Sequence, residues 1–472
     1  MILFLSLIAL PVTAADKPQI LRAGAALSNL TPPLGGGIIG GFHPIPSTHI
    51  HDELHARCLA LDNGETRLAI VVCDLLGASR EVYDAARRLV TEETGLPGAN
   101  LFMSSTHTHS ATSALGTNRF RIHTPLDEYQ QFVARRIADG VRRAMNNLAP
   151  ARIGWATGQE PNHVFNRRWF LKPGTMPVNP FGSTNDLVKM NPGRASPSLD
   201  RPSGPTDPEI CLVSVQSPQG RPIAVLANYS LHYVGGMGGG QISADYFGEF
   251  ARLMPSRLRG DENFVAMMSN GTSGDINNIP FGVTRPPRAP FEQIRIVAQK
   301  AADTAWFAQQ KIGTHRNEAR LGMRQREVTL RYRRPGAQDI VEAKTVLAVK
   351  DQKAIERLPR LAQNYAGTVV RAAERNEETI TIIIQAIRIG DLAVCGIPFE
   401  TFVEIGLDLK KRSPFPQTMV IGLANGRHGY LPTPEQHKLG GYETWLGTNW
   451  VQEDASVILV NHLLEMLTEL KP

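Results

Sequence analysis

The feature that most constrains the fold of this chain is the alternation of short apolar runs with longer amphipathic segments. Apolar runs at residues 54–61 and 67–74 flank a turn at 62–64, whose Asn-Gly pair favours a β-hairpin. A helical pattern at 79–93 and a short buried strand at 101–103 follow. Strands that alternate with helices predict an α/β fold, with a mixed β-sheet core flanked by helices.

The same alternation continues to the end of the chain. Further strands are expected at 209–216, 222–229, 380–389, 391–397 and 419–424, and further helices at 125–148, 245–258, 290–310, 338–371, 400–411 and 454–470. Residues 161–208 are rich in Pro, Gly and Asn and are too long for an ordinary connection. We therefore expect an inserted functional or rim loop there.

The N-terminus indicates export. The apolar run at residues 2–10 is too short to span a bilayer, and Val12-Thr13-Ala14 offers a small-x-small cleavage pattern. Residues 1–15 are therefore predicted to be a signal peptide, which places the protein outside the cell or in the periplasm. A buried N-terminal strand is the alternative, because a basic leading region is missing. No later segment has the apolar length of a transmembrane helix.

Composition and cysteine usage exclude some classes of protein. The 50 basic and 44 acidic residues give a net charge of only +6, and no basic run carries interleaved aromatics, so no nucleic-acid partner is expected. Cys58, Cys73, Cys211 and Cys395 form no CxxC pair, which argues against a thiolate zinc knot. Export would permit a Cys58–Cys73 bridge, whereas four buried free thiols are the alternative.

Two histidines, His107 and His109, follow directly after the expected strand at 101–103. Residues two apart in an extended segment share a face, so both imidazoles would point the same way. Such a pair suits a metal site, or one ligand beside one acid/base group, while local hydrogen bonding of both rings is the alternative. The hydroxyl-bearing residues at 104–106, 108 and 110 favour a site, because they can hold ligands in place by hydrogen bonds.

Other polar residues lie where other expected strands end. His232 follows the strand at 222–229, Glu400 follows the strand at 391–397, and Tyr430 follows the strand at 419–424. Singly, each has a simpler explanation: Glu400 would complement a helix dipole, and a loop tyrosine such as Tyr430 or Tyr442 would only pack. Together they favour a common site, because the ends of several strands meet at one edge of a sheet.

These segments resemble the neutral (non-lysosomal) ceramidase family, specifically its N-terminal catalytic domain. The sequence THTHS at residues 106–110 is the most specific match. GLAN at 422–425, GY at 429–430, TPE at 433–435 and Tyr442 are similar to the other end of that domain, and HDELHAR at 51–57 also looks similar. By this resemblance, residues 20–472 would form one ceramidase-like catalytic domain with that family's fold.

The resemblance also implies a site. Zinc would be bound by His107, His232, Glu400 and Tyr430, a mixed ligand set that suits Zn²⁺ and leaves room for water. His109, Tyr442 and Arg167 would face the scissile amide.

The chain departs from the family pattern in three places. The family's serine after Gly-Asp-Val corresponds to Asn277, so a serine-dependent mechanism is not carried over; Asp275 and Asn277 are expected to contact the substrate. The sequence HSATS at 109–113 replaces HSGPG, which changes the pocket wall. The family's C-terminal immunoglobulin-like domain has no counterpart after the last expected helix.

The expected function is zinc-dependent hydrolysis of an N-acyl amide, either a ceramide-like lipid or another acyl amide. Zinc would lower the pKa of bound water from 15.7 to about 7, His109 would act as base or acid, and Tyr442 with Arg167 would hydrogen-bond the oxyanion. Aromatic residues make up only 7% of the chain and no apolar stretch indicates a lipid groove. Two alternatives therefore stay open: a secreted zinc hydrolase acting on an ester or glycan-derived substrate, and a non-catalytic protein with structural zinc.

Overall fold

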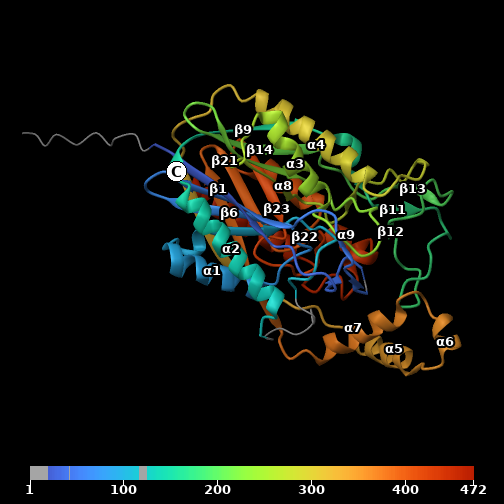
Figure 1. Ribbon diagram of the computed structural model, residues 1–472. Helices are drawn as coiled ribbons and strands as arrows, with labels where there is room; N and C mark the ends of the chain where they lie inside the picture. Colours follow the sequence, from blue (N-terminus) through green and yellow to red (C-terminus); the bar gives the residue numbers. More distant parts are fainter. Residues whose placement is uncertain (1–19, 42, 116–124, 472) are drawn as a thin grey trace, which may run out of the picture.

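Three β-sheets form the centre of the molecule and helices cover their outer faces (Figure 1). The computed structural model describes residues 20–41, 43–115 and 125–471. The predicted signal peptide at 1–15 lies outside the described residues. The predicted α/β class, a mixed β-sheet core flanked by helices, is confirmed.

The first sheet has the strand order β7-β6-β5-β1-β8 and contains the predicted hairpin. Its strands are β1 (Arg22–Asn29), β5 (His55–Asp62), β6 (Arg67–Cys73), β7 (Leu101–Ser105) and β8 (Ala149–Pro150). β5 and β6 pair antiparallel, and β6 pairs parallel with β7. Helices α1 (Arg80–Thr94) and α2 (Glu128–Asn146) pack on one face of this sheet.

The second and third sheets have the same plan. The second has the order β17-β15-β14-β9, and the third has the order β19-β20-β21-β23. The strands of the second sheet are β9 (Arg152–Gln159), β14 (Glu209–Gln216), β15 (Pro222–Tyr229) and β17 (Val265–Asn270), covered by α3 (Asp245–Leu258) and α4 (Glu292–Gln310). The strands of the third are β19 (Leu321–Arg331), β20 (Thr379–Ile389), β21 (Leu392–Ile397) and β23 (Gln417–Gly422), covered by α8 (Val403–Arg412) and α10 (Ala455–Leu470). Each sheet carries one parallel pair, β15 with β17 and β21 with β23 in these two.

The inner faces of the three sheets share one apolar core. Strand β6 shows how: Leu68, Ile70 and Val72 face this shared core, while Ala69 and Val71 face α1 and α2. Because such a strand is buried on both faces, its sequence is a continuous apolar run rather than an alternating pattern. The layering therefore holds the ends of strands from all three sheets in fixed positions.

Short elements connect these layers. The passage at 161–208, expected as a loop, contains η2 (Pro161–His163), β10 (Phe165–Asn166) and a small sheet of β11 (Arg168–Leu171), β12 (Val188–Met190) and β13 (Leu199–Pro202). The remaining short elements are β2 (Gly37–Ile38), β3 (Ile45–Pro46), β4 (His49–Ile50), η1 (Gly98–Asn100), β16 (Gln241–Ile242), β18 (Ile276–Asn277), β22 (Glu400–Thr401), β24 (Tyr430–Leu431), α9 (Pro434–Lys438) and η3 (Tyr442–Thr444).

Two predicted helices differ from the structure. The stretch at 338–371 is three helices, α5 (Ala337–Ala348), α6 (Gln352–Glu356) and α7 (Ala362–Glu374), which lie apart from the sheets (Figure 1). Pro359 lies between α6 and α7, and proline disfavours continuation of a helix. The helix predicted to begin at Glu400 begins instead at Val403. Glu400 belongs to β22, which pairs parallel with β24 and so prevents a helical start there.

All four cysteines are buried free thiols, so the alternative of a Cys58–Cys73 bridge is wrong. The two residues lie on neighbouring strands, but Cys58 pairs with Val71 and Cys73 pairs with Ala56, so they are not opposite each other. Burial raises the pKa of Cys58 to about 12, which keeps the thiol protonated. Within the described ranges, no helix combines the length and the apolar character needed to cross a membrane.

Candidate metal centre and active site

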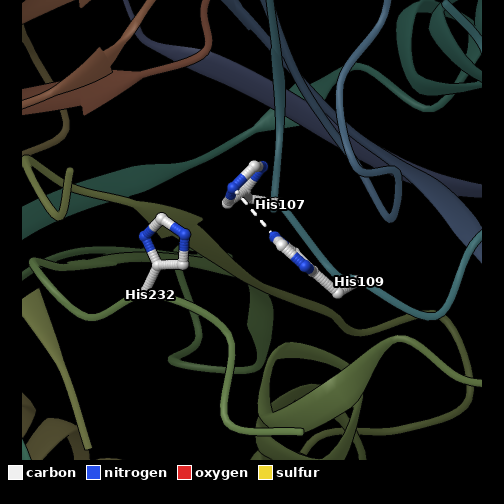
Figure 2. Close-up of side chains that lie close together, drawn as sticks. All are labelled: His107, His109 and His232. Atoms are coloured by element: carbon white, nitrogen blue, oxygen red, sulfur yellow. Dashed lines mark hydrogen bonds between the residues drawn. The ribbon is translucent and has the colours of Figure 1, made fainter. Parts of the chain in front are cut away.

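Three histidines meet where strands of two sheets end. His107 and His109 follow β7, and His232 follows β15 (Figure 2). One ring nitrogen of each lies within 4.8 Å of those of the other two, and the Nε2 atoms of His107 and His109 are 3.2 Å apart. His107 and His232 are fully buried, while His109 is partly exposed. The sequence prediction that His107, His109 and His232 lie together agrees with this geometry.

The local backbone brings His107 and His109 together in an unexpected way. They were expected to share a face of an extended segment, but β7 ends at Ser105 and His107 has a φ of 73°. A non-glycine residue in this left-handed region costs about 1–3 kcal/mol and persists only where the surroundings impose it. The hydrogen bond from the His107 N–H to the Leu75 carbonyl is part of that constraint.

Hydrogen bonds to the backbone fix the tautomers of two of the imidazoles. The Nδ1 of His107 lies 2.6 Å from the Leu76 carbonyl oxygen, and the Nδ1 of His232 lies 2.9 Å from the Ser273 carbonyl oxygen. A carbonyl only accepts hydrogen bonds, so each Nδ1 carries the proton and each Nε2 presents a lone pair. This is the usual arrangement of a metal-binding histidine.

Glu400 completes a group of acceptors that face one another. Its Oε2 lies 3.3 Å from the Nε2 of His107 and 3.9 Å from the Nε2 of His232, while its Oε1 accepts a 2.6 Å hydrogen bond from Arg427. Burial opposes ionisation of Glu400, but the Arg427 guanidinium holds the pKa of its carboxyl well below the usual range. The carboxylate is therefore charged although it is fully buried.

Two of these buried atoms have no hydrogen-bond partner among the described residues, the Nε2 of His232 and the Oε2 of Glu400. His109 can donate its Nε2 proton to the Nε2 of His107, but the Nε2 of His232 and the Oε2 of Glu400 are still left without a hydrogen-bond donor. Converging buried acceptors without donors are costly unless a cation lies between them. The residues present therefore fit a metal ion.

Tyr430 lies beside Glu400 because the parallel strands β22 and β24 pair these two residues directly. The Tyr430 hydroxyl accepts a 3.0 Å hydrogen bond from Arg167, whose Nε donates to Glu443 at 3.0 Å. Burial raises the pKa of Tyr430 well above its usual value, and the Glu400 carboxylate adds to this rise. A metal ion bound next to the Tyr430 hydroxyl would lower this pKa and favour the phenolate.

A cavity of about 1100 Å³ reaches the site from the phenol side, and Arg427, Tyr430 and Tyr442 line it. The rings of Tyr430 and Tyr442 meet edge to face with centroids 5.7 Å apart. Burial raises the pKa of the Tyr442 hydroxyl to about 12, so it is a hydrogen-bond donor at neutral pH. The cavity size falls at the upper end of the range for small-molecule sites.

Arg167, Asp275 and Asn277 lie behind this site rather than in the cavity wall. Asp275 is fully buried, and its carboxylate accepts hydrogen bonds from the Asn166 side chain at 2.8 Å and the Val403 N–H at 2.9 Å. Asn277 uses its side chain on Asn191 and on the N–H of Ile279. Burial raises the pKa of Asp275 to about 7. Asp275 and Asn277 make these intramolecular contacts, and their contact with substrate stays a prediction.

Sequence reasoning did not single out three residues of the site, Arg427, Glu443 and Tyr233. Arg427 binds Glu400, Glu443 joins Arg167 to Arg168, and the Tyr233 ring stacks on His109 with centroids 3.6 Å apart. Arg427 and Glu443 carried a weak signal, because each lies within a few residues of a predicted site tyrosine.

This three-sheet architecture is also found in solved structures of ceramidases. A crystal structure of neutral ceramidase from Pseudomonas aeruginosa matches with a TM-score of 0.70 at 17% identity, covering 96% of this chain and 75% of that chain. A structure described as a ceramidase complexed with C2 matches with a TM-score of 0.70 at 16% identity and the same coverage. No protein-family model and no curated protein matches the sequence. The fold expected from the family resemblance is confirmed.

Proposed function

We propose that the protein is a zinc-dependent hydrolase that cleaves an N-acyl amide with water, as the resemblance to neutral ceramidases implies, in a secreted or periplasmic setting. The observation that carries the proposal is that the buried Nε2 of His232 and the charged Oε2 of Glu400 lie beside the Nε2 of His107 and have no hydrogen-bond donor of their own. Such a group has little use in a protein other than binding a cation.

His107, His232, Glu400 and Tyr430 would hold the metal. Nitrogen and oxygen ligands without a thiolate are found in catalytic zinc sites. When bound, the ion supplies a Lewis acid and lowers the pKa of water from 15.7 to about 7.

In the overall reaction, the oxygen of water bonds to the carbonyl carbon, the C–N bond breaks, and the leaving amine takes up a proton from the water. His109 is placed to move that proton, because burial lowers the pKa of its imidazole well below the usual value and keeps it neutral. Its stacking on Tyr233 holds the ring in place.

Tyr442 would donate a hydrogen bond to the oxygen on which negative charge develops. Arg167 donates hydrogen bonds to Tyr430 and Glu443 and does not line the cavity. We assign to Arg167 the orientation of Tyr430 rather than contact with the amide.

The test measures amine release from a panel of N-acyl compounds, with matched esters and glycosides, before and after treatment with a chelator. We expect chelator-sensitive release from amides, and one zinc ion per chain that is lost in His107→Ala. Activity that resists the chelator, or no activity on any amide, would falsify the proposal. Metal retained without any activity would favour a structural zinc site, and activity on esters or glycosides alone would favour that second class of hydrolase.

A further inference from the structure

The cavity beside the site carries a cation that the hydrolytic reaction does not use. Four arginines line it: Arg80, Arg371, Arg375 and Arg427. Arg427 pairs with Glu400, and Arg80 pairs with Asp84 at 3.1 Å and with Glu327. Arg427 and Arg80 therefore both have carboxylate partners within the protein.

Arg375 is the cation whose surroundings point to a ligand. It makes no ion pair with any described residue, and its Nη1 is buried without a hydrogen-bond partner. Its guanidinium lies over the Tyr332 ring at 3.9 Å and over the Trp450 ring at 4.9 Å. The two aromatic faces fix the plane of the guanidinium, so its N–H groups are oriented in advance for a planar acceptor.

Arg375 is connected to the reacting end of the cavity by direct packing. The Trp450 ring packs so close to Gly429 that a Cβ added there would lie 3.3 Å from its Cδ1, and Gly429 precedes Tyr430. Arg371 lies one helical turn before Arg375, near the end of α7, and also lines the cavity. Arg371 and Arg375 therefore line the same cavity as Tyr430 and Tyr442.

The other residues that line the cavity also indicate what kind of ligand would fit. Apolar side chains are present as well, namely Leu115, Leu126, Leu347, Ile380 and Val451. The acidic side chains in the lining are Glu81, Asp84 and Glu377, of which Asp84 is already paired with Arg80. A ligand that fits has an apolar body and one anionic end.

We propose that Arg375 binds a carboxylate, or a similar oxyanion, on the substrate and so selects amphipathic anionic N-acyl compounds over neutral lipids of the ceramide type. This inference rests on the proposed amide hydrolysis and names the substrate class. A neutral lipid would cover the guanidinium of Arg375 and offer it no charged acceptor, which leaves a charged donor group unpaired in the filled cavity. An anionic substrate removes that cost.

The test compares paired substrates that differ only in one charge. In one arm, the suberyl amide of a fluorescent amine is compared with its octanoyl amide; in the other, N-octanoyl amino acids are compared with their carboxamides. We expect kcat/KM to favour the anionic member at least tenfold in one arm. Arg375→Gln is expected to reduce that ratio to about twofold or less, and Arg375→Lys to retain part of it. Arg357→Gln is the matched control, because Arg357 follows α6 and does not line the cavity; it should keep the full ratio.

Binding of suberate, measured by calorimetry in wild type and Arg375→Gln, separates the two proposals. Suberate binding that Arg375→Gln abolishes, with no amine release from any substrate, would sustain the anion site and reject the hydrolase. Equal kcat/KM for both members of every pair, or a preference unchanged in Arg375→Gln, would overturn the anion site while leaving amide hydrolysis intact. The wild-type ratio needs no variant, so a variant that fails to fold cannot hide a negative result.

Discussion

At the scale of single residues, the site depends on side chains whose protonation is set by burial. Tyr442 shows the effect directly: its raised pKa of about 12 keeps the hydroxyl protonated, and it lines the cavity next to Tyr430. A neutral donor in that position can stabilise developing negative charge without itself binding the metal.

Replacing Tyr442 with phenylalanine is therefore expected to lower kcat by about 10²–10³-fold, the usual loss for one such donor, while zinc content stays at the wild-type level. Steady-state kinetics and elemental analysis measure the two quantities. Tyr129→Phe is the control, because Tyr129 lies on α2 outside the cavity and its hydroxyl donates to the Leu30 carbonyl. An undiminished rate in Tyr442→Phe would remove this residue from the mechanism.

Glu443 lies between two buried guanidinium groups, and its loss is expected to destabilise the whole fold. Its carboxylate binds Arg167 at 3.0 Å and Arg168 at 2.8 Å, and all three side chains are buried. Breaking a buried pair by removing one partner costs about 3–5 kcal/mol, because the remaining charge stays buried. We expect Glu443→Gln to lower the free energy of unfolding by about that amount in urea titrations.

The matched control for Glu443→Gln is an exposed pair, Arg221 with Asp261 at 2.9 Å. Exposed pairs contribute at most about 1 kcal/mol, so Asp261→Asn should shift the urea midpoint only slightly. Equal shifts in the two variants would mean that Glu443 does not hold the buried arginines.

At the scale of elements, strand β1 approaches α2 closely at Gly24. A Cβ added there would lie 2.2 Å from the Ala144 carbonyl oxygen, near the end of α2, and 2.7 Å from the carbonyl carbon of Asn147. Both neighbours are backbone atoms, so they cannot move as a flexible side chain would. Only glycine permits β1 and α2 to approach this closely.

Gly24→Ala is therefore expected to lower the free energy of unfolding by about 1–3 kcal/mol, the usual cost of overpacking. Gly313→Ala is the control, since nothing lies within 4 Å of the added methyl group. Thermal unfolding should show a lower melting temperature for Gly24→Ala and an unchanged one for Gly313→Ala. A Gly24→Ala protein as stable as wild type would contradict the close packing.

The sequence was sufficient for elements whose pattern is local, and insufficient for those defined by their neighbours. Strand β6 was predicted from its apolar run, but β19 was not, because its sequence LGMRQREVTLR is mostly polar and only its pairing with β20 along its whole length makes it a strand. The sequence placed Glu400 at the start of a helix. Its strand partner Tyr430 lies thirty positions later in the chain, and a pairing over that distance leaves no local sequence pattern. The positions of the predicted strand ends were enough to select His107, His232, Glu400 and Tyr430 as site residues. Arg427 and Glu443 were found only from their ion pairs in the folded structure.

At the scale of the whole molecule, metal binding should be linked to folding. The acceptors His107, His232 and Glu400 converge only in the native structure, so a metal binds the folded state in preference to the unfolded one. A ligand present at 100 times its dissociation constant stabilises the folded state by about 2.7 kcal/mol. We expect chelator treatment to lower the melting temperature, and added Zn²⁺ to restore it.

The control for this measurement is the double variant His107→Ala/His232→Ala, whose melting temperature should be the same with chelator and with Zn²⁺. A wild-type melting temperature that does not respond to either treatment would contradict metal binding at this site. Because the readout is thermal unfolding, it does not depend on finding a substrate.

The three sheets contribute the proposed ligands: positions 107, 232 and 400 closely follow strands of parallel pairs, and position 430 follows β23 after a loop. During synthesis, a nascent chain that has emerged only as far as the second sheet carries His107, His109 and His232 but neither the acid nor the phenol. Capture of an ion by the complete proposed ligand set would therefore be a late event that depends on completion of the last sheet.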